Sequence, residues 1–165
     1  MDPQRSPRSD TGHTPQWEIA ARCAQALGRS GDETAIPYLI QALKLDVDWL
    51  VSQKSAEALG FFSASEAITR VLMVALNRGS FQGEAAKQSL VSQGEFAVPF
   101  LLENLKKTTS YEGFTMTVQV LGLIGDKEAV SSLAGARQRI DELAVEDRWK
   151  RQLGSEIDAA LEAIQ

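Results

Sequence analysis

The sequence repeats itself at an interval of 31 or 32 residues, and two short markers carry the repeat. The first marker occurs as Ala26-Leu27-Gly28, Ala58-Leu59-Gly60, a weaker Ser89-Leu90-Val91, and Val120-Leu121-Gly122. The second occurs as Ala35-Ile36-Pro37, Ala67-Ile68, Ala97-Val98-Pro99 and Ala129-Val130. Both markers keep the same register along the chain. A period of this length predicts an array of similar supersecondary units, each stacked on the next.

Apolar residues within each unit follow a helical period, so each unit is predicted to be a pair of helices. In the first unit, a helix over residues 16–27 precedes Gly28 and Gly31, which suit a helix end. Asp32 suits the cap of the next helix, and Pro37 falls early in that helix, where a missing N–H costs little. The other predicted helices span residues 47–59, 66–77, 82–92, 96–107, 112–124, 127–140 and 145–164.

The predicted repeat domain covers residues 16–165, and residues 1–15 are expected to be a disordered polar tail. That tail holds three prolines and no apolar period. It also lacks the apolar stretch of a secretory signal. The longest apolar run, residues 71–76, is too short to cross a membrane. Together with a single cysteine, Cys23, these features predict a cytoplasmic protein without membrane insertion.

An Ala-Leu-Gly helix end, a Gly-Asp turn, an Ala-Ile-Pro start and a Leu-rich second helix together resemble HEAT repeats. The short period, and the opening of the second unit at residues 46–51, resemble the variety found in phycobilisome-lyase-like proteins. The resemblance covers about residues 16–140. It implies an all-α fold: a right-handed α-α superhelix of the HEAT/armadillo type, with about four two-helix repeats and a C-terminal capping helix. Protein binding is the common role in the family, and some relatives are bilin lyase subunits or phycobiliprotein chaperones.

Residues suited to catalysis do not form a recognisable constellation. The one histidine, His13, lies in the predicted tail, so the His-Glu pairs that an iron site needs are missing. Cys23 stands among alanines in a packed helix, which favours a buried thiol that acts as a small hydrophobe. Asp46 and Asp48 sit at a turn, where helix caps are the natural role. No catalytic residue, metal ligand or cofactor is therefore expected, and the net charge of −5 disfavours a nucleic-acid partner.

The second helices are expected to carry the binding surface, since these helices usually line the concave face of HEAT solenoids. Core positions such as Leu39, Leu43, Leu72 and Leu101 fix the rotation of each helix, and the residues between them form columns that face outward. Two columns gather the residue types that are enriched in interfaces. The candidate partner-binding residues are Tyr38, Gln41, Arg70, Met73, Phe100 and Glu103. A third outward column is predicted at Lys44, Leu76, Lys106 and Gln138.

The sequence therefore favours a non-enzymatic module that binds another protein as an adaptor, scaffold or assembly factor. The alternative, which follows from the resemblance, is a bilin lyase subunit or a phycobiliprotein-handling chaperone. Trp49, at the start of a first helix, is a further candidate contact. The final helix either closes the core or joins the chain to a second copy. Its apolar stripe is Leu153, Ile157, Ala160, Leu161 and Ile164.

Overall fold

The computed structural model describes residues 14–46, 48–140 and 146–164, and this part of the chain is all-helical without strands. The helices run in order as α1 (Gln16–Ser30), α2 (Ile36–Leu45), α3 (Trp49–Leu59), α4 (Glu66–Arg78), α5 (Ser80–Gln93), α6 (Val98–Lys107), α7 (Tyr111–Ile124), α8 (Ala129–Arg139) and α9 (Asp147–Ile164). Two short 3₁₀ turns, η1 (Glu33–Ala35) and η2 (Gly94–Ala97), lead into α2 and α6.

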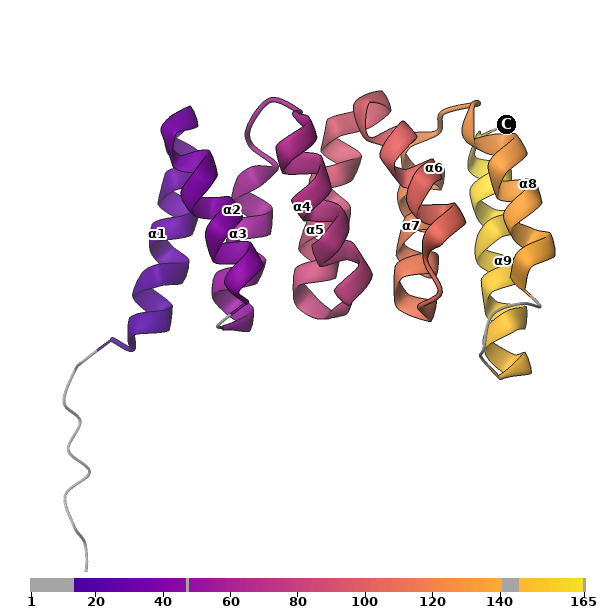
Figure 1. The fold of residues 1–165 in the computed structure, drawn as a ribbon, viewed down its shortest axis with the longest axis horizontal. Coiled ribbons are helices and arrows are strands. Elements are labelled where there is room, and N and C mark those ends of the chain that lie inside the picture. The colour runs from indigo at the N-terminus through magenta and orange to yellow at the C-terminus, as the bar shows by residue number, and fades with distance from the viewer. Residues whose placement is uncertain (1–13, 47, 141–145, 165) are drawn as a thin grey trace, which may run out of the picture.

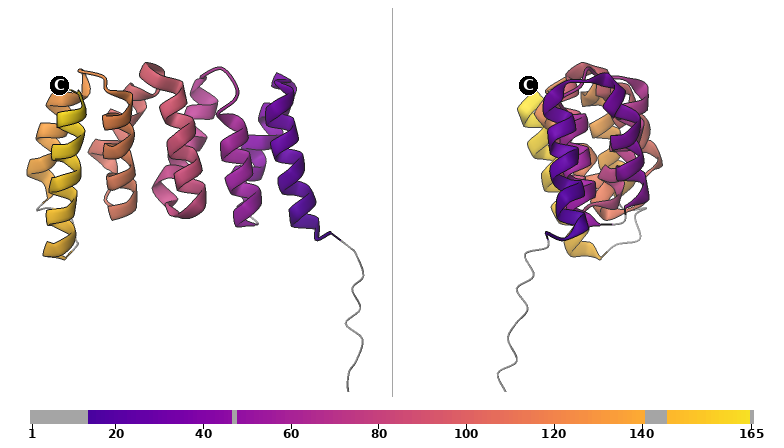
Figure 2. Two further views of the ribbon diagram at one scale, coloured as in Figure 1. Left: turned by 180° about the vertical axis from the view of Figure 1, so that it is seen from behind. Right: turned by 90° about the vertical axis from the view of Figure 1, so that its left-hand side faces the viewer.

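The helices form two layers (Figures 1 and 2). Helices α1, α3, α5, α7 and α9 pack on one another in sequence order and make the first layer. Helices α2, α4, α6 and α8 make the second layer in the same way. Each second-layer helix also packs against the next first-layer helix, as α2 does on α3 and α4 on α5. The predicted HEAT-like α-solenoid is confirmed.

Local signals in the sequence set the helix ends. Gly31 adopts a left-handed backbone (φ 68°) at the end of α1, which a residue without a Cβ tolerates best. The Asp32 carboxylate then accepts a hydrogen bond from the Thr34 backbone N–H at 2.9 Å and caps η1. Asp48 caps α3 by accepting a bond from the Leu50 N–H, also at 2.9 Å. The capping roles predicted for both aspartates are therefore confirmed.

One continuous apolar core runs between the layers from α1 to α9. The predicted core residues Leu39, Leu43, Leu72 and Leu101 are almost fully buried. The stripe on α9 closes the far end of this core, with Leu153 and Ile157 inaccessible to solvent. Predicted bounds differ from the observed ones by up to three residues, and the starts predicted at Val47 and Val145 lie outside the described residues. So do residues 1–13, including His13 and most of the predicted tail.

Helix α4 buries a wider face than α2 and α6, which overturns part of the predicted outward surface. Leu39 and Leu43 of α2 correspond to Val71 and Ala75 of α4, and all four are buried as predicted. Helix α4 packs on α7 as well as on α5, and its inward face extends further round the helix. Leu76 and Met73 therefore point inward with 0% and 8% exposure, although both were expected to face solvent.

Gly28 lies inside α1, and its predicted place beyond the helix end is wrong. It is buried where α1 meets α3. A Cβ at this position would come within 2.7 Å of both the Cα and the Cβ of Ala58. The same close approach recurs between α7 and α9, where a Cβ on Gly122 would lie 2.9 Å from the Cβ of Ala160. The glycine of the first marker therefore lets neighbouring first-layer helices touch backbone to backbone.

Cys23 is exposed, so the prediction that it is a buried small hydrophobe is wrong. Its helix, α1, stands at the end of the first layer, and no described helix covers its outward side (Figure 2). Leu27 is also 38% exposed, whereas its counterparts Leu59, Leu90 and Leu121 are inaccessible. The repeat pattern predicted burial correctly for units inside the stack but not for its first helix.

A candidate protein-binding groove between α4 and α6

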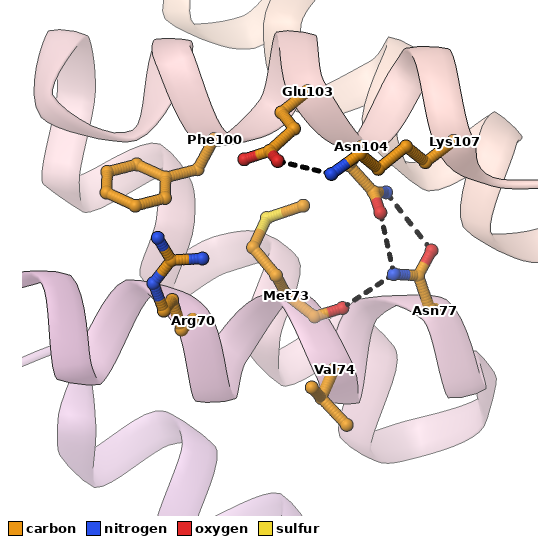
Figure 3. Close-up of a pocket in the computed structure, with 8 residues that line it drawn as sticks. All are labelled: Arg70, Met73, Val74, Asn77, Phe100, Glu103, Asn104 and Lys107. Atoms are coloured by element: carbon orange, nitrogen blue, oxygen red, sulfur yellow. Dashed lines mark hydrogen bonds and ion pairs between the residues drawn. The ribbon is translucent and has the colours of Figure 1, made fainter.

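A groove with a volume of about 360 Å³ opens between the neighbouring second-layer helices α4 and α6 (Figure 3). Both helices contribute four residues to its lining. They are Arg70, Met73, Val74 and Asn77 from α4, and Phe100, Glu103, Asn104 and Lys107 from α6. Figure 3 shows Arg70 and Phe100 facing each other at one end, with the two asparagines and Lys107 at the other.

The apolar part of the groove comes from Met73, Val74 and Phe100. The Met73 side chain extends between the two helices and forms the floor, and Val74 on the α4 side is 50% exposed. Phe100 is half-buried against the core and stacks on Phe96, with ring centroids 5.9 Å apart. The Arg70 guanidinium lies over the Phe100 ring at 5.4 Å from its centroid, a cation–π distance. These contacts hold the aromatic ring at the groove's edge in one orientation.

A network of amides closes the opposite end of the groove. Asn77 donates to the Asn104 side-chain oxygen at 2.8 Å, and Asn104 donates back to Asn77 at 3.1 Å. Asn104 also donates to the Thr117 hydroxyl on α7 at 2.8 Å, and Asn77 to the Met73 carbonyl at 3.0 Å. Because half-buried amides are costly unless they are hydrogen-bonded, this network fixes the spacing of α4 and α6.

Charged side chains form the rim of the groove. Arg70 pairs with Glu66 on its own helix at 2.7 Å, and Lys107 pairs with Glu103 at 2.5 Å. The Lys107 ammonium lowers the pKa of the Glu103 carboxyl below its usual value by hydrogen bonding and by its charge, and Arg70 adds a smaller effect in the same direction. Exposed pairs of this kind contribute little to stability. Their charges remain accessible to a bound partner, so they are suited to orienting it.

The structure gathers four of the six predicted binding residues in this groove: Arg70, Met73, Phe100 and Glu103. Met73 joins them as the floor rather than as an outward side chain. Tyr38 and Gln41 are exposed on α2 and are not part of the groove lining. The sequence-based columns missed Val74, Asn77, Asn104 and Lys107. Val74 is 50% exposed but belonged to none of the predicted columns, and the reciprocal pairing of the asparagines depends on how two non-consecutive helices meet.

Other exposed aromatic residues lie elsewhere. Trp49 is 55% exposed at the start of α3 and packs on Phe81 of α5, with centroids 5.0 Å apart. Phe61 is 65% exposed in the α3–α4 loop, while its neighbour Phe62 is buried. Trp149 packs on Tyr111 at 4.9 Å. None of these rings belongs to the groove.

Within the described residues, no helix is long and apolar enough to span a bilayer. Residues 12–91 match a family model described as HEAT repeats. This match covers the first two repeat units and the start of the third, and it supports a HEAT-repeat protein. No curated protein matches the sequence. The likeness to phycobilisome lyases receives no support from the match, which is to the HEAT repeat in general.

Proposed function

We propose that the chain is a protein-binding module and that the groove between α4 and α6 receives its partner. HEAT repeats generally mediate interactions between proteins, which supports the class of function. The groove itself is the observation that supports this location for the binding site. It is the place where an aromatic ring, a methionine, an arginine and an exposed valine of neighbouring second-layer helices meet around one hollow.

The composition of the groove suits a protein segment that inserts one apolar side chain. Met73 and Phe100 offer an apolar surface, and Val74 extends it on the α4 side. Interfaces concentrate their binding energy in such pockets, where aromatic, Arg and Met side chains are enriched. The polar rim would then exclude water and fix the orientation of the segment. A carboxylate on the partner could replace Glu66 beside Arg70 or Glu103 beside Lys107.

The groove is largely formed before any partner arrives. Asn77 and Asn104 hold the two helices at one spacing, and Phe100 is held between Arg70 and Phe96. A site that is already ordered loses less conformational entropy on binding. The module would therefore act as a rigid adaptor or scaffold, with its specificity set by a few side chains. No described feature of the groove favours the alternative of a bilin lyase subunit or phycobiliprotein chaperone.

The test begins with affinity capture of a partner from the native cell extract, followed by calorimetric titration of the purified pair. Val74→Asp and Phe100→Ala should each weaken binding by roughly tenfold or more, as expected when the centre of an interface is altered. Val74 is half-exposed, so its replacement leaves the core intact. Tyr38→Ala removes an aromatic ring that is 69% exposed outside the groove, and it should leave the affinity unchanged.

The results distinguish binding in the groove from binding elsewhere on the second layer. If Tyr38→Ala weakens binding while the two groove variants do not, the partner uses α2 and the proposed groove is wrong. If all three variants bind as the wild type does, the second layer is not the binding surface. Circular dichroism of each variant confirms that the fold is retained.

A further inference from the structure

Helix α1 presents an apolar surface that no described part of the chain covers. Ile19 is 50% exposed and Leu27 38% exposed, and Cys23 lies between them at helical spacing. Ala20 and Ala26 beside this stripe are exposed as well. The right-hand view of Figure 2 looks onto this end of the molecule, where α1 and α2 face the viewer.

This surface continues an interface that the chain already uses between its own units. The counterparts of Leu27 in the later units are Leu59, Leu90 and Leu121, and those of Cys23 are Ser55, Ala86 and Thr117. All six are inaccessible to solvent. They are buried because α3, α5 and α7 each pack on a preceding first-layer helix and a preceding second-layer helix. Helix α1 presents the equivalent side of its own unit, but the described residues include no preceding helix of either layer to cover it.

The outward surface at the other end of the solenoid, on α9, differs in polarity from that of α1. The outward side of α9 is exposed and mostly polar, with Arg148, Arg151, Gln152, Ser155 and Glu162 around the small Ala159. The apolar stripe of α9, which the sequence offered as a second-copy contact, is instead part of the core. A head-to-tail stack of copies would therefore place the apolar side of α1 against a charged helix. A pairing of α1 with α1 avoids this mismatch.

The length and pattern of α1 make it complementary to itself. The helix spans Gln16–Ser30, so Cys23 is its central residue. When two copies lie antiparallel in full overlap, a two-fold axis passes beside Cys23, and Ile19 of one copy meets Leu27 of the other. Ala20 and Ala26 lie on either side of the stripe, and such small side chains let the backbones approach closely. Antiparallel helix dipoles add a favourable term.

Charges on one flank of α1 match in the same register. Glu18, Arg22 and Arg29 lie on one side of the apolar stripe, where Glu18 is 2.5 Å from Arg22 in its own helix. A two-fold axis brings equivalent flanks together, so Glu18 of each copy lies opposite the last turn of its partner, which carries Arg29. We therefore expect Glu18 and Arg29 to attract each other across the pair, once on each side of the axis. The apolar and charged residues thus select the same alignment.

We propose that two copies of this chain form a symmetric antiparallel dimer through α1, with Cys23 beside the two-fold axis. In this dimer the repeat surface left open at the end of one copy is covered by the same surface of the other. The groove between α4 and α6 lies in the other layer and stays accessible in both copies. A partner with two binding segments would then gain affinity by engaging both grooves.

The mass in solution, measured by sedimentation over a range of protein concentrations, tests the dimer. The full chain should approach twice its 18.0 kDa monomer mass as its concentration rises. Ile19→Asp places a charge in the contact at an already exposed position, so the variant should fold normally and stay monomeric. Leu123→Asp is the matched control, because Leu123 is 63% exposed on α7 in the same layer and should leave the dimer intact. A wild type that stays monomeric, or an Ile19→Asp variant that still dimerises, overturns the proposal.

The register is tested by cross-linking, since Cys23 is the only thiol in the chain. Diamide oxidises two thiols to a disulfide and takes up the two electrons and two protons that they lose. The wild type should convert to a covalent dimer, while the variant that combines Cys23→Ser with Gln152→Cys, which moves the thiol to α9, should not. A dimer by sedimentation that resists cross-linking at Cys23, or that cross-links equally at position 152, overturns the antiparallel α1 pairing.

A charge exchange gives an independent check on the same register. Glu18→Arg and Arg29→Glu should each raise the dimer dissociation constant by roughly two- to tenfold, given the modest energy of exposed ion pairs. The double variant, which restores opposite charges across the two-fold axis, should recover most of the loss. If the double variant shows the summed losses of affinity of the two single variants, Glu18 and Arg29 do not lie opposite each other, and the alignment is wrong.

Discussion

Replacing Gly28 with alanine is expected to destabilise the protein, although alanine forms helices better than glycine does. Gly28 lies within α1, where α1 meets α3. The added Cβ would lie 2.7 Å from both the Cα and the Cβ of Ala58 and 3.2 Å from its carbonyl oxygen. Two of these three atoms belong to the backbone of α3, so no side-chain rotation can relieve the clash. The two helices must instead move apart, which disturbs the contact that joins the first unit to the second.

The magnitude follows from two opposing effects. Exchanging glycine for alanine inside a helix stabilises the folded state by roughly 0.5–1 kcal/mol, because the unfolded chain loses conformational freedom. Forcing an extra methyl group into a packed contact costs about 1–3 kcal/mol. The clash is with backbone, so the second effect dominates, and a net loss of about 1–2 kcal/mol is expected. Gly122→Ala should act in the same direction, because its Cβ would meet Ala160 at 2.9 Å.

Gly135 is the matched control for this experiment. It lies within α8, and a Cβ there would have no neighbouring atom within 4 Å. Gly135→Ala should therefore show the helix effect alone and stabilise the protein by roughly 0.5–1 kcal/mol. Urea unfolding followed by circular dichroism measures all three variants. If Gly28→Ala is as stable as the wild type or more stable, the close approach of first-layer helices at the repeat glycine is wrong.

Three further predictions concern the amide network, a helix cap and a carboxyl group. Asn104→Ala should lower the free energy of unfolding by about 1–3 kcal/mol, because the Asn77 amide on α4 and the Thr117 hydroxyl on α7 lose their hydrogen bonds with it; unchanged urea unfolding would contradict the network. Asp48→Ala removes the cap of α3 and should cost about 1 kcal/mol, measured by thermal unfolding. In an NMR titration the Glu103 carboxyl should have a pKa below its ordinary value, and Lys107→Met should raise it. Because folding lowers this pKa, the ionised carboxyl stabilises the folded state above the ordinary pKa of glutamate. This stabilisation is lost as the pH falls through the lowered pKa.

The repeat made the fold predictable from the sequence. A period of 31 or 32 residues, with Leu59, Leu90 and Leu121 at one register, required a stack of similar helix pairs, and the structure shows one. Caps such as Asp48 could be predicted because capping depends only on a side chain and the backbone two or three residues away. Capping signals are local, so they can be recognised in the sequence without knowledge of the tertiary structure.

The positions that the sequence placed wrongly depend on neighbours that a repeat pattern cannot describe. Cys23 and Leu27 have the pattern of buried residues, but the helix that would bury them is not among the described elements. Met73 and Leu76 lie inward because α4 packs on α7 as well as on α5, so its buried face is wider than that of α2 or α6. The repeat pattern does not reveal such an additional neighbour, which moves a side chain from the surface to the core.

The candidate groove was predictable only in part for the same reason. Arg70, Phe100 and Glu103 were found because outward positions on neighbouring second helices meet across a solenoid. The Asn77–Asn104 pair was missed, because the two residues are 27 positions apart and this separation differs from the repeat.

Site-specific photocrosslinking tests the central claim, that the groove between α4 and α6 is the partner-binding surface. The photoreactive residue p-benzoylphenylalanine is placed at Val74 in the groove or, as a control, at Leu123 on the opposite layer, and both variants are irradiated with the captured partner. Both positions are exposed and apolar, with 50% and 63% exposure. The predicted result is a covalent adduct from position 74 and none from position 123. An adduct from position 123 alone would show that the partner binds the first layer and would contradict the proposed groove.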